Sequence, residues 1–168
     1  MLETRRTDRR AATVVLLLTA STGVLAAAYY FEHVLGYQPC QLCLYQRIPW
    51  WIVGGLACVM ILFRRRRLPL GGLLALAVLV LAANAGIAGY HVGVEQQWWP
   101  GPTSCSVDGA TSFEDLKAQL LAAPIVRCDE VQWSLFGLSM AGYNVVLSAG
   151  VAVLAASALG QRGRRQWV

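Results

Sequence analysis

Residues 39–63 read PCQLCLYQRIPWWIVGGLACVMILF, in which a C-x-x-C pair, Cys40 and Cys43, leads directly into an apolar run. Between residues 44 and 63 the only charged side chain is that of Arg47. A helix needs about 20 apolar residues to cross a hydrocarbon core about 30 Å thick. The stretch therefore predicts a membrane-spanning helix with two thiols at its beginning.

The composition of the whole chain also indicates a lipid environment. Of the 168 residues, 57% are apolar and only 14% are charged, and the mean hydropathy is +0.50. A soluble domain has about 25% charged residues. Three further stretches are apolar and of similar length, at residues 11–30, 68–90 and 141–159. We therefore expect an all-α membrane protein, a four-helix transmembrane bundle that forms a single domain over residues 1–168.

The arginines indicate how the bundle is oriented. Eleven of the 14 basic residues precede the first span, join the second span to the third, or follow the fourth: Arg5, Arg6, Arg9, Arg10, Arg64, Arg65, Arg66, Arg67, Arg162, Arg164 and Arg165. Short loops rich in Lys and Arg remain in the cytoplasm. Both termini are expected inside, and the two other loops in the periplasm. The net charge of +5 then reflects topology rather than binding to nucleic acid.

The N-terminus admits a second interpretation. Basic residues, an apolar run and Ala26-Ala27-Ala28 together are typical of a cleavable secretory signal. The apolar run is about 20 residues long, whereas a signal core has about 7 to 15. This length favours an uncleaved first span.

The five cysteines divide into two pairs and one single residue. Cys40 and Cys43 fall in the first outer loop, and Cys105 and Cys128 fall in the second. Both pairs are thus expected on the oxidising side of the membrane, where disulfides persist. Cys58 follows Cys43 by 15 positions, or about 22 Å along a helix. We expect it to be a small buried apolar residue.

The first pair has the features of a reactive dithiol. Cys40 and Cys43 lie one helical turn apart after Pro39, a residue suited to a helix start. The positive end of the helix dipole lowers the pKa of a thiol. Arg47, four positions after Cys43, adds a fixed positive charge on the same face. We therefore expect Cys43 to be the long-lived thiolate, although Arg47 could instead be a side chain that reaches the membrane interface.

The second outer loop begins with aromatic and turn-forming residues at 98–102. Thr111-Ser112-Phe113-Glu114 has the pattern of a capping box. Apolar residues then recur on one helical face before Pro124, at Phe113, Leu116, Leu120 and Leu121. These features predict a short interfacial helix in the second periplasmic loop. A helix packed on top of the bundle is the alternative.

Three segments of the chain closely resemble the DsbB family of disulfide bond formation proteins. They are P-C-x-L-C-x-x-Q-R at residues 39–47, the Tyr90-His91 step that closes the third span, and RCDEVQWSLFGLS at residues 127–139. The resemblance extends over the whole chain, although the segment between the second pair of cysteines is somewhat short and Cys58 is additional. It implies an enzyme, a thiol:quinone oxidoreductase of the bacterial inner membrane that sustains disulfide bond formation.

The resemblance also implies roles for the four paired cysteines. Cys105 is attacked by the reduced thiol of a periplasmic DsbA-like partner, a thioredoxin-fold oxidase, and Cys128 is its mate. The electrons then reach Cys40 and Cys43, with a transient bond between Cys40 and Cys128 as one route. The resting disulfide pattern is left open.

The implied cofactor is a membrane quinone, with ubiquinone favoured over menaquinone. The resemblance places it beside Cys43, near Arg47 and His91. On the sequence alone, a histidine at the outer end of a span is better explained as an interfacial residue. The assignment of His91 as a quinone contact therefore depends on the resemblance.

Other classes of protein fit the sequence less well. The four paired cysteines and His91 have ligand types that bind zinc, but only one close C-x-x-C pair is present, so we expect no metal. A structural four-span protein would use its disulfides to join the outer loops and would not exchange them. A vitamin K epoxide reductase-like enzyme also has four helices and a C-x-x-C pair, but lacks the P-C-x-L-C-x-x-Q-R motif.

Overall fold

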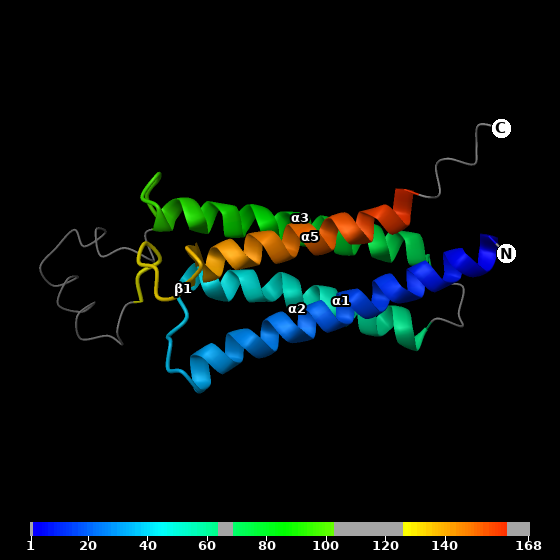
Figure 1. Ribbon diagram of the computed structural model, residues 1–168, viewed down its shortest axis with the longest axis horizontal. Coiled ribbons are helices and arrows are strands. Elements are labelled where there is room, and N and C mark those ends of the chain that lie inside the picture. Colours follow the sequence, from blue (N-terminus) through cyan, green and yellow to red (C-terminus); the bar gives the residue numbers. More distant parts are fainter. Residues whose placement is uncertain (1, 64–68, 103–125, 161–168) are drawn as a thin grey trace, which may run out of the picture.

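The computed structural model describes residues 2–63, 69–102 and 126–160. They form four long helices, α1 (Leu2–His33), α2 (Gln41–Leu62), α3 (Leu70–Glu95) and α5 (Met140–Gly160). A short hairpin of β1 (Ser134–Leu135) and β2 (Leu138–Ser139) precedes α5. Successive helices run in opposite directions, so residues 34–40, the end of α3 and the hairpin lie at one end of the bundle (Figure 1).

All four helices are long and apolar enough to cross a membrane. The qualifying segments are Arg9–His33, Gln41–Leu62, Leu70–Glu95 and Met140–Leu159. The prediction of a four-helix bundle of membrane-spanning helices is therefore confirmed, and the short hairpin is an addition to it. The short interfacial helix was predicted from residues 111–124, which lie outside the described residues, as does Cys105.

The bundle has an apolar core and an apolar outer surface. Trp50, Leu81 and Ala155, from three different helices, are at most 1% exposed in the core. Leu79 and Val153, on two of the same helices, are 66% and 68% exposed. A helix that is apolar all round is typical of a membrane span, since lipid rather than water surrounds it.

Cys58 was predicted to be buried, and that prediction was wrong. Its side chain is an exposed free thiol on α2. Apolar character does not distinguish the core of a membrane bundle from its lipid-facing surface, because both are apolar. Whether Cys58 is buried or exposed therefore depends on how α2 is rotated about its axis, which the composition of the helix does not specify.

Residues 133–139, which contain the hairpin, lie at the end of the bundle. Ser134 pairs with Ser139 and Leu135 with Leu138, which leaves a two-residue turn of Phe136 and Gly137. Both turn residues have positive φ, 50° and 78°, as a tight turn between twisted antiparallel strands requires. Just before the hairpin, the ring of Trp133 contacts those of Phe31 in α1 and Tyr143 in α5.

Candidate active site

Cys40 is the N-cap of α2. Its backbone is extended, with φ −72° and ψ 167°, and its Sγ accepts a hydrogen bond from the backbone N–H of Cys43 at 3.2 Å. The helix therefore begins at Gln41, one residue after the first thiol. A cap side chain receives an N–H group that the helix cannot satisfy itself. The sulfur of Cys40 lies over the positive end of the helix dipole as a result.

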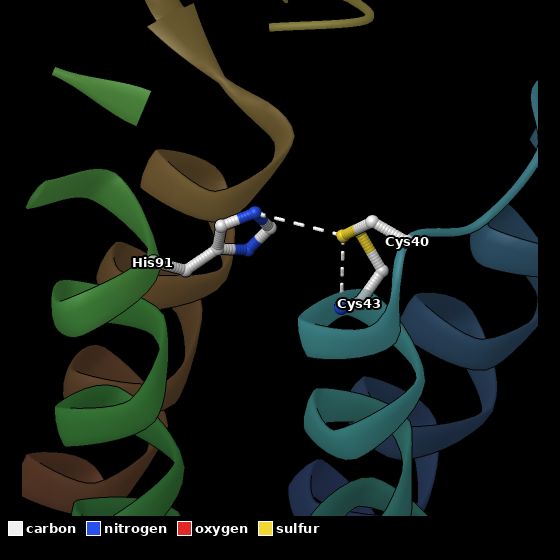
Figure 2. A group of neighbouring side chains, drawn as sticks. All are labelled: Cys40, Cys43 and His91. Atoms are coloured by element: carbon white, nitrogen blue, oxygen red, sulfur yellow. Dashed lines mark hydrogen bonds between the residues drawn. The ribbon is translucent and has the colours of Figure 1, made fainter. Parts of the chain in front are cut away.

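His91 on α3 faces the same sulfur. Its Nε2 lies 3.6 Å from Cys40 Sγ, and its Nδ1 lies 2.8 Å from Gln46 Nε2. Figure 2 shows the imidazole ring directed across the gap between α3 and the start of α2. His91 is only 4% exposed. The ring is thus a buried partner of Cys40 rather than a side chain at an open interface.

The hydrogen bonds around Cys40 make it an acidic thiol. A hydrogen bond from the Cys43 side chain, together with the contacts of His91 and the Cys43 backbone, lowers the pKa of Cys40 from 9.0 to about 5, although burial raises it. The sequence had suggested Cys43 as the thiolate of this pair. In the described structure the donors converge on Cys40 instead, because Cys40 occupies the cap position and Cys43 lies inside the first turn.

Cys128 reaches the same place from the second outer loop. Cys40, Leu42, Val94 and Cys128 form one buried cluster, and Cys128 is 1% exposed. Cys128 is disulfide-bonded, whereas Cys40 and Cys43 are free thiols. The fold thus brings together one cysteine from each pair predicted from the sequence. Its predicted mate, Cys105, lies outside the described residues.

A buried carboxyl group completes this end of α3. Glu95 Oε1 lies 3.9 Å from His91 Nε2, and the Glu95 side chain is 6% exposed. Its other oxygen accepts a hydrogen bond from Ser139 Oγ. Ser139 in turn accepts the backbone N–H of Gly142 at 3.1 Å, so that it also caps α5. Glu95 therefore links the histidine to the hairpin and to the fourth span.

Arg47 on α2 contacts α1. Its guanidinium forms an ion pair with Glu32 at the end of α1 and lies over the Tyr29 ring, 5.1 Å from the centroid. The Arg47 side chain is 15% exposed. The positive charge expected beside Cys43 is therefore shared with a carboxylate from the first span.

The three side chains at the centre of the site could also hold a metal ion. One ligand atom each from Cys40, Cys43 and His91 lies within 4.8 Å of the others. Two thiolates and an imidazole are ligand types that zinc accepts. This chemistry is available only while both cysteines are reduced.

Four of the residues that surround the predicted site were not singled out from the sequence: Glu32, Gln46, Glu95 and Asn144. Gln46 lies within the quoted motif, and Glu95 lies one helical turn after His91. Charged and amide side chains within apolar spans are costly unless they have partners. This cost is the feature of the sequence that could have drawn attention to all four residues, but it does not identify the partner of each one.

Fold and site together define a class, a helical multi-pass membrane protein with a C-x-x-C thiol pair at one end of its bundle, of which Cys40 is buried. The family model for disulfide bond formation protein DsbB matches residues 9–158. The chain therefore belongs to the DsbB family, and membership implies thiol oxidoreductase activity and the use of a quinone.

Relatives extend over most of the chain. Disulfide bond formation protein B of Verminephrobacter eiseniae is 34% identical over 171 residues, covering 96% of this chain and 92% of its own length. The protein of the same name from Albidiferax ferrireducens is 30% identical over 155 residues, covering 88% and 86%. An uncharacterized protein of Rickettsia prowazekii is 26% identical over 145 residues, covering 84% and 83%. No solved structure matches the chain.

Proposed function

We propose that this chain is a thiol:quinone oxidoreductase that reoxidises a periplasmic DsbA-like thioredoxin-fold oxidase and passes the electrons to a membrane quinone. The observation that carries the proposal is the buried cluster that contains both Cys40 and Cys128. These two residues belong to different cysteine pairs and come from different loops. Two redox pairs that meet in this way can exchange a disulfide.

The first exchange takes place with the soluble partner. A thiolate of the reduced partner attacks Cys105, which breaks the Cys105–Cys128 disulfide and forms a mixed disulfide. The second thiol of the partner then attacks the partner's own sulfur atom in the mixed disulfide. This releases Cys105 and leaves the partner in its oxidised form. Two electrons and two protons have moved to this chain, and Cys105 and Cys128 are left as a dithiol.

The second exchange moves the electrons toward the membrane. The Cys128 thiolate attacks Cys40 within the Cys40–Cys43 disulfide and releases Cys43 as a thiolate. Cys105 then attacks Cys128, which re-forms the outer disulfide and releases Cys40. A thiol with a low pKa is a good leaving group. The pKa of Cys40, lowered to about 5, therefore favours this last step.

The third step returns the inner pair to its disulfide. Cys40 and Cys43 bond to each other, which releases two electrons and two protons. A membrane quinone, ubiquinone in preference to menaquinone, would accept them when bound. Arg47 supports this acceptor, because its guanidinium carries N–H groups that suit carbonyl oxygens. Cys43 and His91 are added to the proposed site by the family resemblance. Apolar side chains next to Arg47 on α2 are exposed toward lipid, where a lipid-soluble molecule can approach: Leu44, Tyr45 and Ile48.

We also propose that the chain lies in the bacterial inner membrane with both termini in the cytoplasm. The support is the sequence asymmetry, since only Arg47, Lys117 and Arg127 of the basic residues fall at the cysteine end. A membrane-impermeant thiol reagent should reach the reduced cysteines of spheroplasts from outside. Labelling of these cysteines only in inverted vesicles would contradict the orientation.

The test of function is turnover with purified components. Full-length protein, a reduced DsbA-like oxidase and either quinone should yield oxidised partner and an equal amount of quinol. Serine substitution of any one paired cysteine should abolish turnover: Cys40, Cys43, Cys105 or Cys128. Cys58→Ser is the matched control, because Cys58 is a free thiol exposed on α2, and it should retain the rate.

Two outcomes would contradict the proposal. If the disulfides of the purified protein do not exchange with the reduced partner, they serve to join loops. If the protein retains about one equivalent of zinc per chain and loses its activity on chelation, the thiols and His91 form a metal centre.

A further inference from the structure

A line of polar side chains leads from His91 into the centre of the bundle. Gln46 Nε2 lies 2.8 Å from His91 Nδ1, and Gln46 Oε1 accepts a hydrogen bond from Asn144 Nδ2. Asn144 Oδ1 in turn accepts from Trp50 Nε1 at 2.8 Å. Gln46 is 5% exposed and Trp50 is 1% exposed. The line joins buried positions of α2, α3 and α5, where a polar group without a partner is costly.

The direction of these hydrogen bonds is determined at Trp50. An indole N–H can only donate, so the atom of Asn144 that faces it must be the oxygen. Ser148 Oγ also donates to this oxygen, at 3.2 Å. The amide nitrogen of Asn144 then faces Gln46 and can only donate, so Gln46 presents its oxygen to Asn144 and its nitrogen to His91.

The opposite direction is excluded by the same contacts. Reversing the Asn144 amide would place its NH₂ group 2.8 Å from the Trp50 N–H, a contact between two donors. Reversing Gln46 alone would place its NH₂ group against that of Asn144. Nδ1 of His91 therefore faces a donor and must be the acceptor, which leaves the ring proton on Nε2.

We propose that Trp50, Asn144 and Gln46 form a directional hydrogen-bond relay that keeps the proton of neutral His91 on Nε2, aimed at the sulfur of Cys40. Nε2 lies 3.6 Å from that sulfur. The relay residues are positioning residues, because they act on the thiolate only through His91. The inference rests on the proposed function in one respect, the use of a Cys40 thiolate in disulfide exchange.

Other groups face the same ring and sulfur. Cys43 in the first turn of α2 contacts Cys40, Glu95 on α3 approaches His91 Nε2, and the backbone of Cys128 contacts the ring from the second loop. The Cys128 contact comes from outside these two helices. None of the three contacts is made by a relay residue, so the relay can be tested separately.

The first test observes the tautomer directly. The chain has two histidines, so His33→Gln leaves a single imidazole in isotope-labelled, reduced, full-length protein. Nitrogen NMR in micelles, without quinone or partner, should show the His91 proton on Nε2. A proton on Nδ1 would overturn the proposal in a protein with an intact relay.

The second test removes relay residues. Gln46→Leu and Asn144→Leu should each increase the population with the proton on Nδ1 and raise the midpoint pH of Cys40 thiolate formation by about 1 pH unit. The hydrogen bonds of Asn144 reach His91 only through Gln46 in the described part of the chain, so an unchanged tautomer in Asn144→Leu would overturn the relay. Ser21→Ala is the matched control, since Ser21 is 1% exposed and donates to Leu18 O, and it should change neither quantity.

The outcomes separate the two proposals. A proton on Nδ1 together with normal quinone reduction would overturn the relay alone. A proton on Nε2 that depends on Asn144, in a protein that does not reduce quinone, would overturn the proposed function alone.

Discussion

Arg47 and Glu32 form an ion pair that joins the second helix to the end of the first. The two side chains are 15% and 24% exposed, and the guanidinium also lies over the Tyr29 ring. An arginine held on two sides keeps several N–H groups in a fixed direction. The placement of this charge therefore depends on α1 as well as on the motif that contains Arg47.

Arg47→Ala should weaken the use of quinone. Loss of a charged donor to a carbonyl oxygen should raise the quinone concentration for half-maximal rate about tenfold, which corresponds to about 1.4 kcal/mol. Steady-state turnover at varied quinone concentration measures this. Glu32→Gln retains the arginine and should change the same quantity by less than about threefold. Equal effects of the two substitutions would contradict a direct role for Arg47.

The reduction potential of the inner pair should depend weakly on pH. Because the pKa of Cys40 is lowered from 9.0 to about 5, reduction of the disulfide between these values takes up two electrons but only one proton. The potential should then fall by about 30 mV per pH unit, rather than about 60 mV for two protons. Redox titration against glutathione or dithiothreitol from pH 6 to 8 measures the slope.

The same shift links pH to the stability of the reduced protein. A pKa that is lower in the folded state gives stability that is fully present above about pH 9 and is lost as the pH falls toward 5.

His91→Ala removes one donor to Cys40 and should steepen the slope of the reduction potential of the inner pair toward about 60 mV per pH unit. A slope near this value in the unaltered protein would show that the thiolate is absent.

Gly93→Ala should disturb the end of α3. A Cβ atom on Gly93 would lie 1.9 Å from the ring of Trp99. That ring stacks on Tyr90 with centroids 5.9 Å apart. The substitution should cost about 1 to 3 kcal/mol through displacement of the ring, measured by thermal unfolding in detergent. Gly89→Ala on the same helix meets no atom within 4 Å and should not destabilise. A Gly93→Ala protein as stable as Gly89→Ala would show that Trp99 lies elsewhere.

Ser139→Ala should remove two hydrogen bonds at once. The hydroxyl accepts the N–H of Gly142 and donates to the buried Glu95. Loss of the cap and of the donor should lower the free energy of unfolding by about 1 to 2 kcal/mol, measured by denaturant titration in micelles. Ser157→Ala, at an exposed hydroxyl that donates to Leu154 O, should change it by less than about 0.5 kcal/mol. Equal changes in both would contradict the capping role.

The features that the sequence predicted correctly are those set by short stretches of chain. The four spans follow from runs of apolar residues, because crossing lipid requires a certain length of helix whatever its neighbours are. The C-x-x-C pair of Cys40 and Cys43 is likewise local, and so is the resemblance carried by residues 39–47. Cys58 shows the limit of such reasoning, because a lipid-facing position and a core position have the same apolar character.

What the sequence by itself determined is therefore a helical membrane protein with four spans and a vicinal pair of cysteines. Only the tertiary structure decided which thiol lies beside a histidine, since His91 lies 51 positions from Cys40 and meets it through the packing of α3 against α2. The partners of Arg47 and Gln46, which are Glu32 and Asn144, were decided in the same way. A polar side chain inside an apolar span must find a partner, but which partner it finds depends on how the helices rotate and pack.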